Sequence, residues 1–174
     1  MNTKDNIVLI GMPGVGKSTV GVVLAKITGY RFVDSDLVIQ EETGKLLHEI
    51  ISEKGLEGFI QVENDVNKNL QVTRSVIATG GSVIYGAEAM EHLKEIGTVV
   101  YLKLSCEGIK KRLGDLKKRG VARKDGQTLE SLYAERIPLY EKYADVTIHC
   151  GGKKIRTIVA ELTRKLGFEN GTEE

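Results

Sequence analysis

Short apolar runs alternate with amphipathic stretches along this chain. Residues 7–10 form a continuous apolar run closed by Gly11, which is typical of a strand buried on both faces of a parallel sheet. Similar runs predict strands at residues 31–33, 75–78, 99–102 and 146–148. Apolar residues at helical spacing predict helices at residues 18–28, 87–95, 107–113, 129–143 and 155–166, with a helical region at 37–69 that is broken near Gly44, Gly55 and Gly58.

This alternation predicts an α/β fold, in which a parallel sheet lies between two layers of helices. The sequence shows no linker, so we expect one domain over residues 1–174. Residues 114–128 are charged and poor in core-forming side chains, and we interpret them as a mobile lid rather than a domain boundary. In sheets of this kind, ligands bind beyond the carboxyl ends of the strands.

Composition and charge exclude several classes of protein. The 174 residues include 25 Lys and Arg against 24 Asp and Glu, for a net charge of +1, which argues against a nucleic-acid or anionic-membrane binder. No apolar run approaches the ~20 residues of a membrane span, and the first residues lack a signal-peptide core. Two cysteines are too few for a disulfide framework. We expect a cytoplasmic protein, monomeric or weakly dimeric, that acts on a small molecule.

Residues 11–18 match the phosphate-binding motif G-x-x-x-x-G-K-S/T without a mismatch, between an apolar strand and an amphipathic helix. Glycines let backbone N–H groups turn inward around phosphate oxygens, and the helix that follows adds its positive end. The motif predicts that Lys17 contacts the β- and γ-phosphates and that the Ser18 hydroxyl ligates Mg²⁺. The expected nucleotide-binding residues are Gly11, Gly14, Val15, Gly16, Lys17, Ser18 and Thr19.

Other nucleotide-binding classes fit poorly. Signalling GTPases carry an N-K-x-D motif, and the nearest segment here, residues 67–70, lacks the Asp. The LSGGQ signature of transporter ATPases is absent from the sequence. A small kinase remains.

Two acidic residues, Asp34 and Asp36, follow the second predicted strand. One carboxylate can hold Mg²⁺ through water while the other accepts a proton from, or orients, an acceptor hydroxyl. Either residue can instead cap the helix that follows. After the third strand, Gly80 and Gly81 let a substrate lie against bare backbone, although a plain turn is the alternative.

Basic residues provide further candidates. Arg136 has no acidic residue three or four positions away on its helix, which leaves its guanidinium available for a carboxylate or phosphate. The lid carries Arg119 and Arg123 among its basic residues, and such groups can close over ATP and stabilise charge on the transferring phosphoryl group. The alternative for the lid is a solvated charged loop.

Five segments together resemble the shikimate kinase family: GMPGVGKSTVG (11–21), DSDLVIQEETG (34–44), GLEGFIQVEND (55–65), ATGGSVI (78–84) and ERIPLYEKYAD (135–145). The resemblance implies a three-layer α/β/α P-loop kinase with a five-stranded parallel sheet of order 2-3-1-4-5, ATP, Mg²⁺, and phosphorylation of a ring hydroxyl to give shikimate 3-phosphate. It places Asp36 beside the acceptor hydroxyl, Asp34 near the metal and Arg136 on the acceptor carboxylate. It also places Phe59, position 60, Gly80 and Gly81 near the acceptor, and Lys111 or Arg112 near the adenine.

The chain departs from that family in three places. Where the family has an arginine that shares the shikimate carboxylate with a second arginine, this chain has Ile60. Losing one guanidinium costs about 1.5–3 kcal/mol, or ~10–100-fold in affinity. The lid reads Arg119-Gly120-Val121 instead of Arg-Pro followed by apolar residues, and Ser82 replaces the third glycine of a G-G-G run.

Several functions therefore stay open from the sequence. A kinase acting on shikimate is one, and a kinase of the same fold acting on another hydroxylated metabolite, such as a sugar acid, a polyol or homoserine, is the second. A nucleotide-binding protein without turnover and a nucleoside monophosphate kinase are the others.

Overall fold

The computed structural model describes residues 4–114 and 121–168. The strands are β1 (Asn6–Ile10), β2 (Arg31–Asp34), β3 (Ser75–Ala78), β4 (Gly97–Lys103) and β5 (Val146–His149). The helices are α1 (Lys17–Thr28), α2 (Ser35–Thr43), α3 (Leu47–Lys68), α4 (Ala87–Ile96), α5 (Cys106–Leu113), α6 (Leu129–Tyr143) and α7 (Ile155–Lys165), with a short 3-10 helix η1 (Val83–Tyr85).

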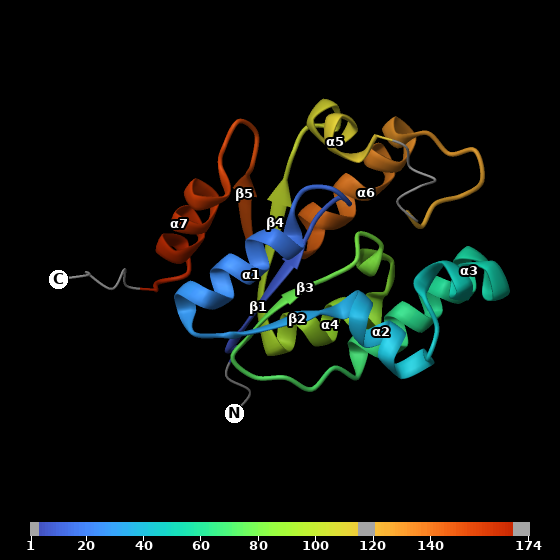
Figure 1. The fold of residues 1–174 in the computed structure, drawn as a ribbon, viewed down its shortest axis with the longest axis horizontal. Coiled ribbons are helices and arrows are strands. Elements are labelled where there is room, and N and C mark those ends of the chain that lie inside the picture. Colours follow the sequence, from blue (N-terminus) through green and yellow to red (C-terminus); the bar gives the residue numbers. More distant parts are fainter. Residues whose placement is uncertain (1–3, 115–120, 169–174) are drawn as a thin grey trace.

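All five strands join one parallel sheet in the order β2-β3-β1-β4-β5 (Figure 1), which confirms the expected topology. β1 is central and every one of its residues is buried, as are all four residues of β3. Residues 7–10 and 76–78 within them are continuously apolar because helices cover both faces of the sheet.

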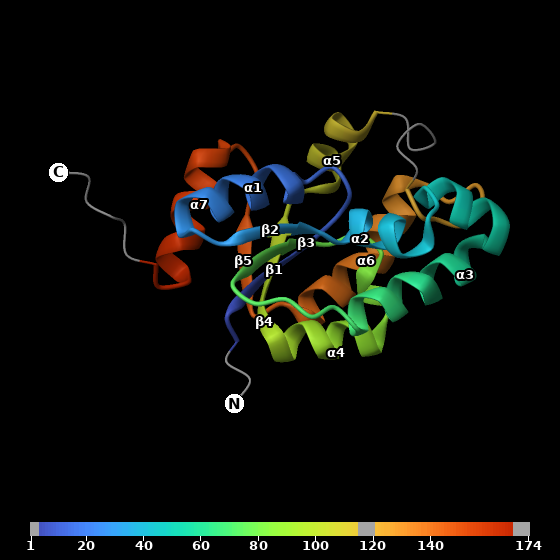
Figure 2. The ribbon, with the colours of Figure 1, turned by 60° about the horizontal axis from the view of Figure 1, so that its bottom comes forward.

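Helices α1 and α7 cover one face of the sheet, and α4 and α6 cover the other (Figure 2). The main apolar core lies between these layers and includes Leu9, Val100 and Ile148, none of which is exposed. None of the described helices is long and apolar enough to cross a membrane.

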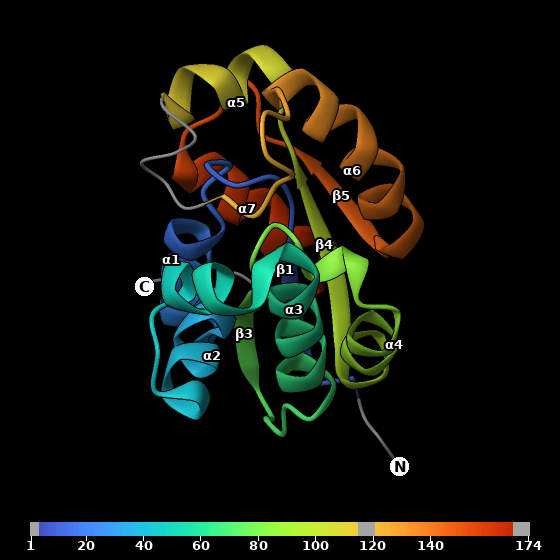
Figure 3. The same ribbon diagram turned by 90° about the vertical axis from the view of Figure 1, so that its right-hand side faces the viewer.

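Helices α2 and α3 lie at one end of the sheet, beyond β2 and β3 (Figure 3). A second, smaller apolar cluster fixes them to each other through Ile39, Ile50, Phe59 and Val66. The expected break near Gly44 is real, because Gly44 ends α2 with a left-handed φ of 68°. Gly55 has non-helical angles inside α3.

The break expected near Gly58 was wrong, because helical structure continues through this residue. A Cβ at Gly58 would lie 2.5 Å from the Cβ of Lys54, one turn earlier. The glycine therefore accommodates a neighbouring side chain in the helix instead of ending it.

Candidate active site

The loop between β1 and α1 has the geometry of a phosphate cradle. Gly14 and Gly16 have φ angles of 84° and 105°, which are left-handed values that favour glycine. A Cβ at Gly11 would lie 2.6 Å from the carbonyl oxygen of Leu102. Sequence and packing therefore both require glycine in this loop.

Lys17 begins α1 and is 8% exposed. Its Nζ donates hydrogen bonds to the carbonyl oxygens of Gly11 at 2.7 Å and Met12 at 3.0 Å. Within the described ranges no salt bridge joins this ammonium to a carboxylate, and burial lowers the pKa of Lys17 to about 8. A buried cation at a helix N-terminus beside a glycine cradle fits a chain of phosphates. Ser18 and Thr19 follow in the first turn with exposed side chains, where a hydroxyl can reach a nucleotide-bound metal.

The acidic pair lies where β2 passes into α2. The Asp34 carboxylate accepts a hydrogen bond of 2.9 Å from the backbone N–H of Asp36, and Asp34 is the N-cap of α2. The capping interpretation therefore holds for Asp34, while the side chain of Asp36 lines a cavity instead. Burial, followed by the nearby Asp34, raises the pKa of Asp36, and the Lys17 ammonium opposes this.

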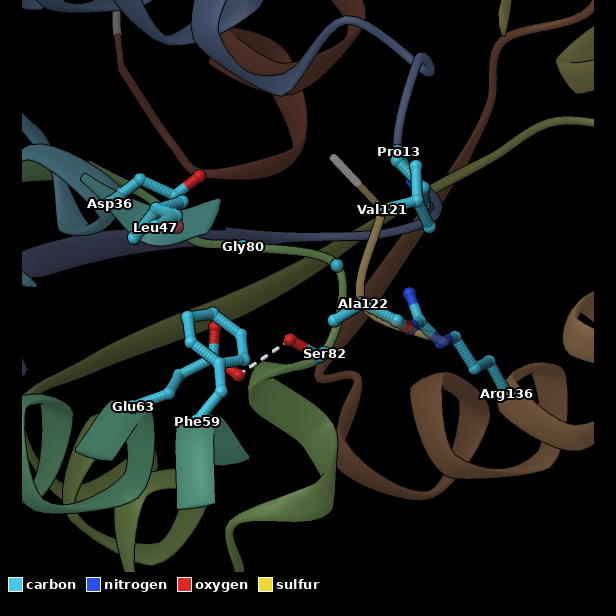
Figure 4. A pocket seen from close by; sticks show the side chains of 11 residues that line it. Pro13, Asp36, Leu47, Phe59, Glu63, Gly80, Ser82, Val121, Ala122 and Arg136 are labelled. Atoms are coloured by element: carbon cyan, nitrogen blue, oxygen red, sulfur yellow. Dashed lines mark hydrogen bonds between the residues drawn. The ribbon is translucent and has the colours of Figure 1, made fainter. Parts of the chain in front are cut away.

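A cavity of about 130 Å³ lies beside the cradle, between α2, α3, η1 and α6 (Figure 4). It joins Asp36, Gly80, Gly81 and Arg136, which the sequence predicted from separate segments. The complete lining is Pro13, Asp36, Leu47, Phe59, Glu63, Gly80, Gly81, Ser82, Val121, Ala122 and Arg136. Its mixture of apolar and polar walls suits a small polar molecule.

Arg136 projects from α6 toward this cavity and is 1% exposed. Its Nη2 donates to the carbonyl oxygen of Ala122, and its guanidinium carbon lies 5.4 Å from the centre of the Tyr85 ring. Its Nε has no hydrogen-bond partner among the described residues. A buried guanidinium with a free donor fits an anionic group such as a carboxylate.

Glu63 and Ser82 are cavity residues to which the sequence gave no role. Ser82 Oγ donates a 2.6 Å hydrogen bond to Glu63 Oε1, and both residues are buried. Burial raises the pKa of Glu63 to about 7. Helical spacing could have indicated that Glu63 is buried, because it falls four residues after Phe59 and three before Val66, on the buried side of α3.

The other predicted site residues are spread around these two centres. Phe59 lines the cavity, whereas Ile60 does not and packs instead against the small apolar cluster of α2 and α3. Arg123 Nη1 donates to the carbonyl of Gln127 at 2.6 Å, and Arg119 lies outside the described residues. Arg112 Nη1 donates to the carbonyl of Val15 at 2.8 Å, next to the cradle, while Lys111 is exposed on the same helix.

A phosphate cradle, a carboxylate next to it and an adjoining cavity together fit a P-loop phosphotransferase that acts on a hydroxyl group. The family model for shikimate kinase matches residues 13–167. The chain belongs to the shikimate kinase family.

Relatives cover nearly the whole chain. A shikimate kinase from Chlorobium chlorochromatii is 37% identical over 171 residues, which span 92% of this chain and 90% of that protein. One from Vibrio campbellii is 38% identical over 169 residues, spanning 95% and 98% of the two chains. The structure of a shikimate kinase from Acinetobacter baumannii in complex with shikimate matches with a TM-score of 0.85 and 35% identity, covering 99% of this chain and 97% of that one.

Proposed function

We propose that this protein transfers the γ-phosphoryl group of ATP, with Mg²⁺, to a ring hydroxyl of shikimate, giving shikimate 3-phosphate. The observation that carries the proposal is the cavity that joins Asp36, the Gly80–Gly81 backbone and the buried Arg136 beside the phosphate cradle. The shikimate complex of the Acinetobacter relative supports shikimate as the acceptor.

Different residues of the chain have different roles in this transfer. The glycine loop and the Lys17 ammonium neutralise the β- and γ-phosphates, so charge that develops during transfer meets fixed positive groups. Asp36 orients the acceptor hydroxyl and accepts its proton. Arg136 holds the acceptor carboxylate, which fixes the distance between hydroxyl and phosphate.

When bound, Mg²⁺ would neutralise charge on the phosphates, and Ser18 and Asp34 are the residues that would hold it, Asp34 through water. Arg123 and Arg119 are the lid residues proposed to approach the γ-phosphate. Arg112, next to Val15, and its neighbour Lys111 are proposed to flank the adenine.

A different acceptor is the second candidate, because Ile60 supplies no second guanidinium for a carboxylate. With Ile60 packed against apolar side chains, Arg136 is the one arginine that lines the described cavity. A hydroxylated molecule that places less negative charge there, such as a polyol or homoserine, is the alternative.

An acceptor panel with release of ADP as the readout tests the proposal. Shikimate, gluconate, homoserine and a polyol are compared with and without Mg²⁺, using the Acinetobacter enzyme as the positive control and Asp36→Asn as the inactive control. We expect shikimate to give the highest kcat/KM of the panel, with a KM raised ~10–100-fold above that of the control enzyme, as loss of one guanidinium implies.

Faster turnover of another member of the panel would establish the alternative acceptor. If ATP binds but no member releases ADP, the protein is a nucleotide-binding protein without turnover.

A further inference from the structure

Glu63 is a buried carboxyl group with one oxygen held and the other free. The residue is 1% exposed, and its Oε1 accepts the 2.6 Å hydrogen bond from Ser82. Its Oε2 has no partner among the described residues. An unpartnered buried oxygen is costly, and a group that supplies or shares a proton there removes that cost.

The free oxygen approaches the same glycine as Asp36. A Cβ built on Gly80 would lie 2.7 Å from Glu63 Oε2 and 2.8 Å from Asp36 Oδ1. Both carboxyl groups line the cavity, with Arg136 on another wall (Figure 4). Two carboxyl groups this close each raise the pKa of the other, and nearby cations oppose this effect.

Helix α3 supplies no such cation. Position 60 lies one turn before Glu63, where side chains three apart are neighbours, and it carries Ile60. The titratable groups that interact with Glu63 come from other elements: Asp36 of α2, Arg136 and Tyr140 of α6, and Lys17 of α1. Glu88 of the adjacent α4 faces away, since it is exposed and contacts Asn64 and Lys68.

The net charge of the cavity wall affects how favourably an anionic acceptor binds. Among the described lining residues, the charged groups are Asp36, Glu63 and Arg136, and the Lys17 ammonium acts on both carboxyl groups without lining the cavity. With both carboxyl groups ionised, an acceptor carboxylate would meet two negative charges and one positive charge in the cavity wall. With Glu63 neutral, the same carboxylate meets a balanced site and a possible O–H donor.

We propose that Glu63 binds an anionic acceptor as the neutral carboxylic acid, so that acceptor binding takes up a proton from solvent, with Ser82 as the positioning residue. By occupying Oε1, the Ser82 hydroxyl leaves Oε2 to carry the proton toward the cavity. The proton adds to a carboxylate oxygen, and no other bond forms or breaks. This proton compensates in part for the guanidinium that Ile60 does not provide, and the inference rests on the proposed function for the identity of the acceptor.

The surroundings of Glu63 place this exchange in the neutral range. Burial raises the pKa of Glu63 to about 7. The Ser82 hydrogen bond opposes that rise, Asp36 adds to it, and the Arg136 and Lys17 cations oppose it. Because the acid form binds the anion, affinity falls as pH increases above about 7, by up to ~10-fold per pH unit, until the pKa of the complex is reached.

Calorimetry of shikimate binding in buffers with different ionisation enthalpies measures the proton directly. We expect uptake of about half a proton at pH 7 and more at pH 8, since a group with a pKa near 7 is about half protonated at pH 7. Glu63→Gln keeps the shape and abolishes the uptake. Ile60→Arg abolishes it by supplying the charge, and it strengthens binding ~10–100-fold. Glu57→Gln, on an exposed position of α3, is the matched control and keeps the wild-type uptake.

Ser82 is tested by the shape of the pH profile. Ser82→Ala removes the hydrogen bond, so the pKa of Glu63 increases and the fall in affinity moves to higher pH. Ser82→Thr retains a hydroxyl and restores the wild-type profile. A role in packing alone would weaken binding without moving the midpoint.

Two results would overturn the inference: no proton uptake by the wild type, or uptake that persists in Glu63→Gln. If shikimate gives no binding heat while ATP binds, the proposed acceptor is wrong, and Glu63 is then tested in the free protein by carbon-13 NMR of its carboxyl group. A midpoint between about 6 and 8 that shifts upward in Ser82→Ala supports the role of the pair, and a midpoint below about 5 rejects it for any acceptor.

Discussion

Burial of the Lys17 ammonium lowers the stability of the free protein and is proposed to favour phosphate binding. Its ammonium is buried against the carbonyls of Gly11 and Met12, and burial lowers its pKa to about 8. A charged group that loses protons more readily in the folded state than in the unfolded chain destabilises the fold where it stays charged. The bound phosphates would remove that cost, so the same burial that destabilises the free protein strengthens nucleotide binding.

Replacing this lysine separates the two effects. We expect Lys17→Met to reduce kcat by at least ~1000-fold, since phosphoryl transfer depends on charge stabilisation, while Tm at pH 7 stays at or above that of the wild type. In the wild type, the unfolded chain holds the Lys17 proton up to its usual pKa of about 10.5 and the folded chain releases it near 8. The free energy of unfolding therefore increases between pH 8 and 10.5.

Urea denaturation at pH 7 and pH 9.5 measures this contribution. The wild-type increase in unfolding free energy should shrink in Lys17→Met, with circular dichroism as the check that the variant is folded. A variant that unfolds more easily than the wild type at pH 7 would show that the two carbonyl contacts outweigh the cost of burying the charge.

The site residues differed in how readily the sequence predicted them. Lys17 was evident because its motif is contiguous, and Asp36 because it directly follows a strand. Glu63 was missed because it lies inside a 22-residue helix with polar Gln61, Asn64 and Asp65 around it, and such a run is typical of a solvated face. Its partner Ser82 comes from a distant segment, and no local pattern joins the two.

At the scale of an element, the stability of α2 depends on the residue just before it. Asp34 caps the helix, and the same residue is proposed to hold the metal through water. Asp34→Ala should lower the free energy of unfolding by about 0.5–2 kcal/mol, because it leaves an N–H without a partner. Asp34→Asn should retain the cap and the stability, since asparagine caps as well as aspartate, yet it removes the charge.

Comparison of the two variants assigns the role of this carboxylate. We expect Asp34→Asn to keep the wild-type denaturation midpoint and to need a higher Mg²⁺ concentration for half-maximal turnover. An unchanged Mg²⁺ dependence in this variant would leave Asp34 as a helix cap alone.

The elements themselves were predictable where burial is continuous. Residues 7–10 of β1 and 76–78 of β3 are apolar because helices cover both faces of these strands, so the pattern alone marks them. The sequence could not distinguish Gly55 from Gly58, because both are glycine. Only Gly55, with a φ of 72°, departs from helical geometry. A Cβ at Gly58 would meet Lys54, one turn earlier, whereas a Cβ at Gly55 would meet no atom within 4 Å, and residue type does not record this difference.

At the scale of the whole molecule, the strand order came from the family resemblance, since alternating apolar runs predict a parallel sheet without fixing its order. That order places the carboxyl ends of β1, β2 and β3 side by side. The cradle, the acidic pair and the glycine pair therefore meet at one edge, although they are far apart in the sequence. Pro13 of the cradle loop also lines the cavity, so the two proposed ligand sites share a residue.

Because the two proposed sites adjoin, we expect the nucleotide and shikimate each to stabilise the fold and each to increase the affinity for the other. A ligand at about 100 times its Kd stabilises by about 2.7 kcal/mol, and a domain of this size gains roughly 2–4 °C in Tm per kcal/mol, so a non-hydrolysable ATP analogue with Mg²⁺ and shikimate should each raise Tm by about 5–11 °C. Lys17→Met should lose the nucleotide shift and keep the shikimate shift, and Arg136→Met should do the reverse. Titrations of each ligand at saturating levels of the other should show equal factors of affinity gain, because coupling between two binding equilibria is reciprocal. If Arg136→Met kept the full shikimate shift, the acceptor would bind elsewhere, because the buried guanidinium is the group proposed to hold its carboxylate.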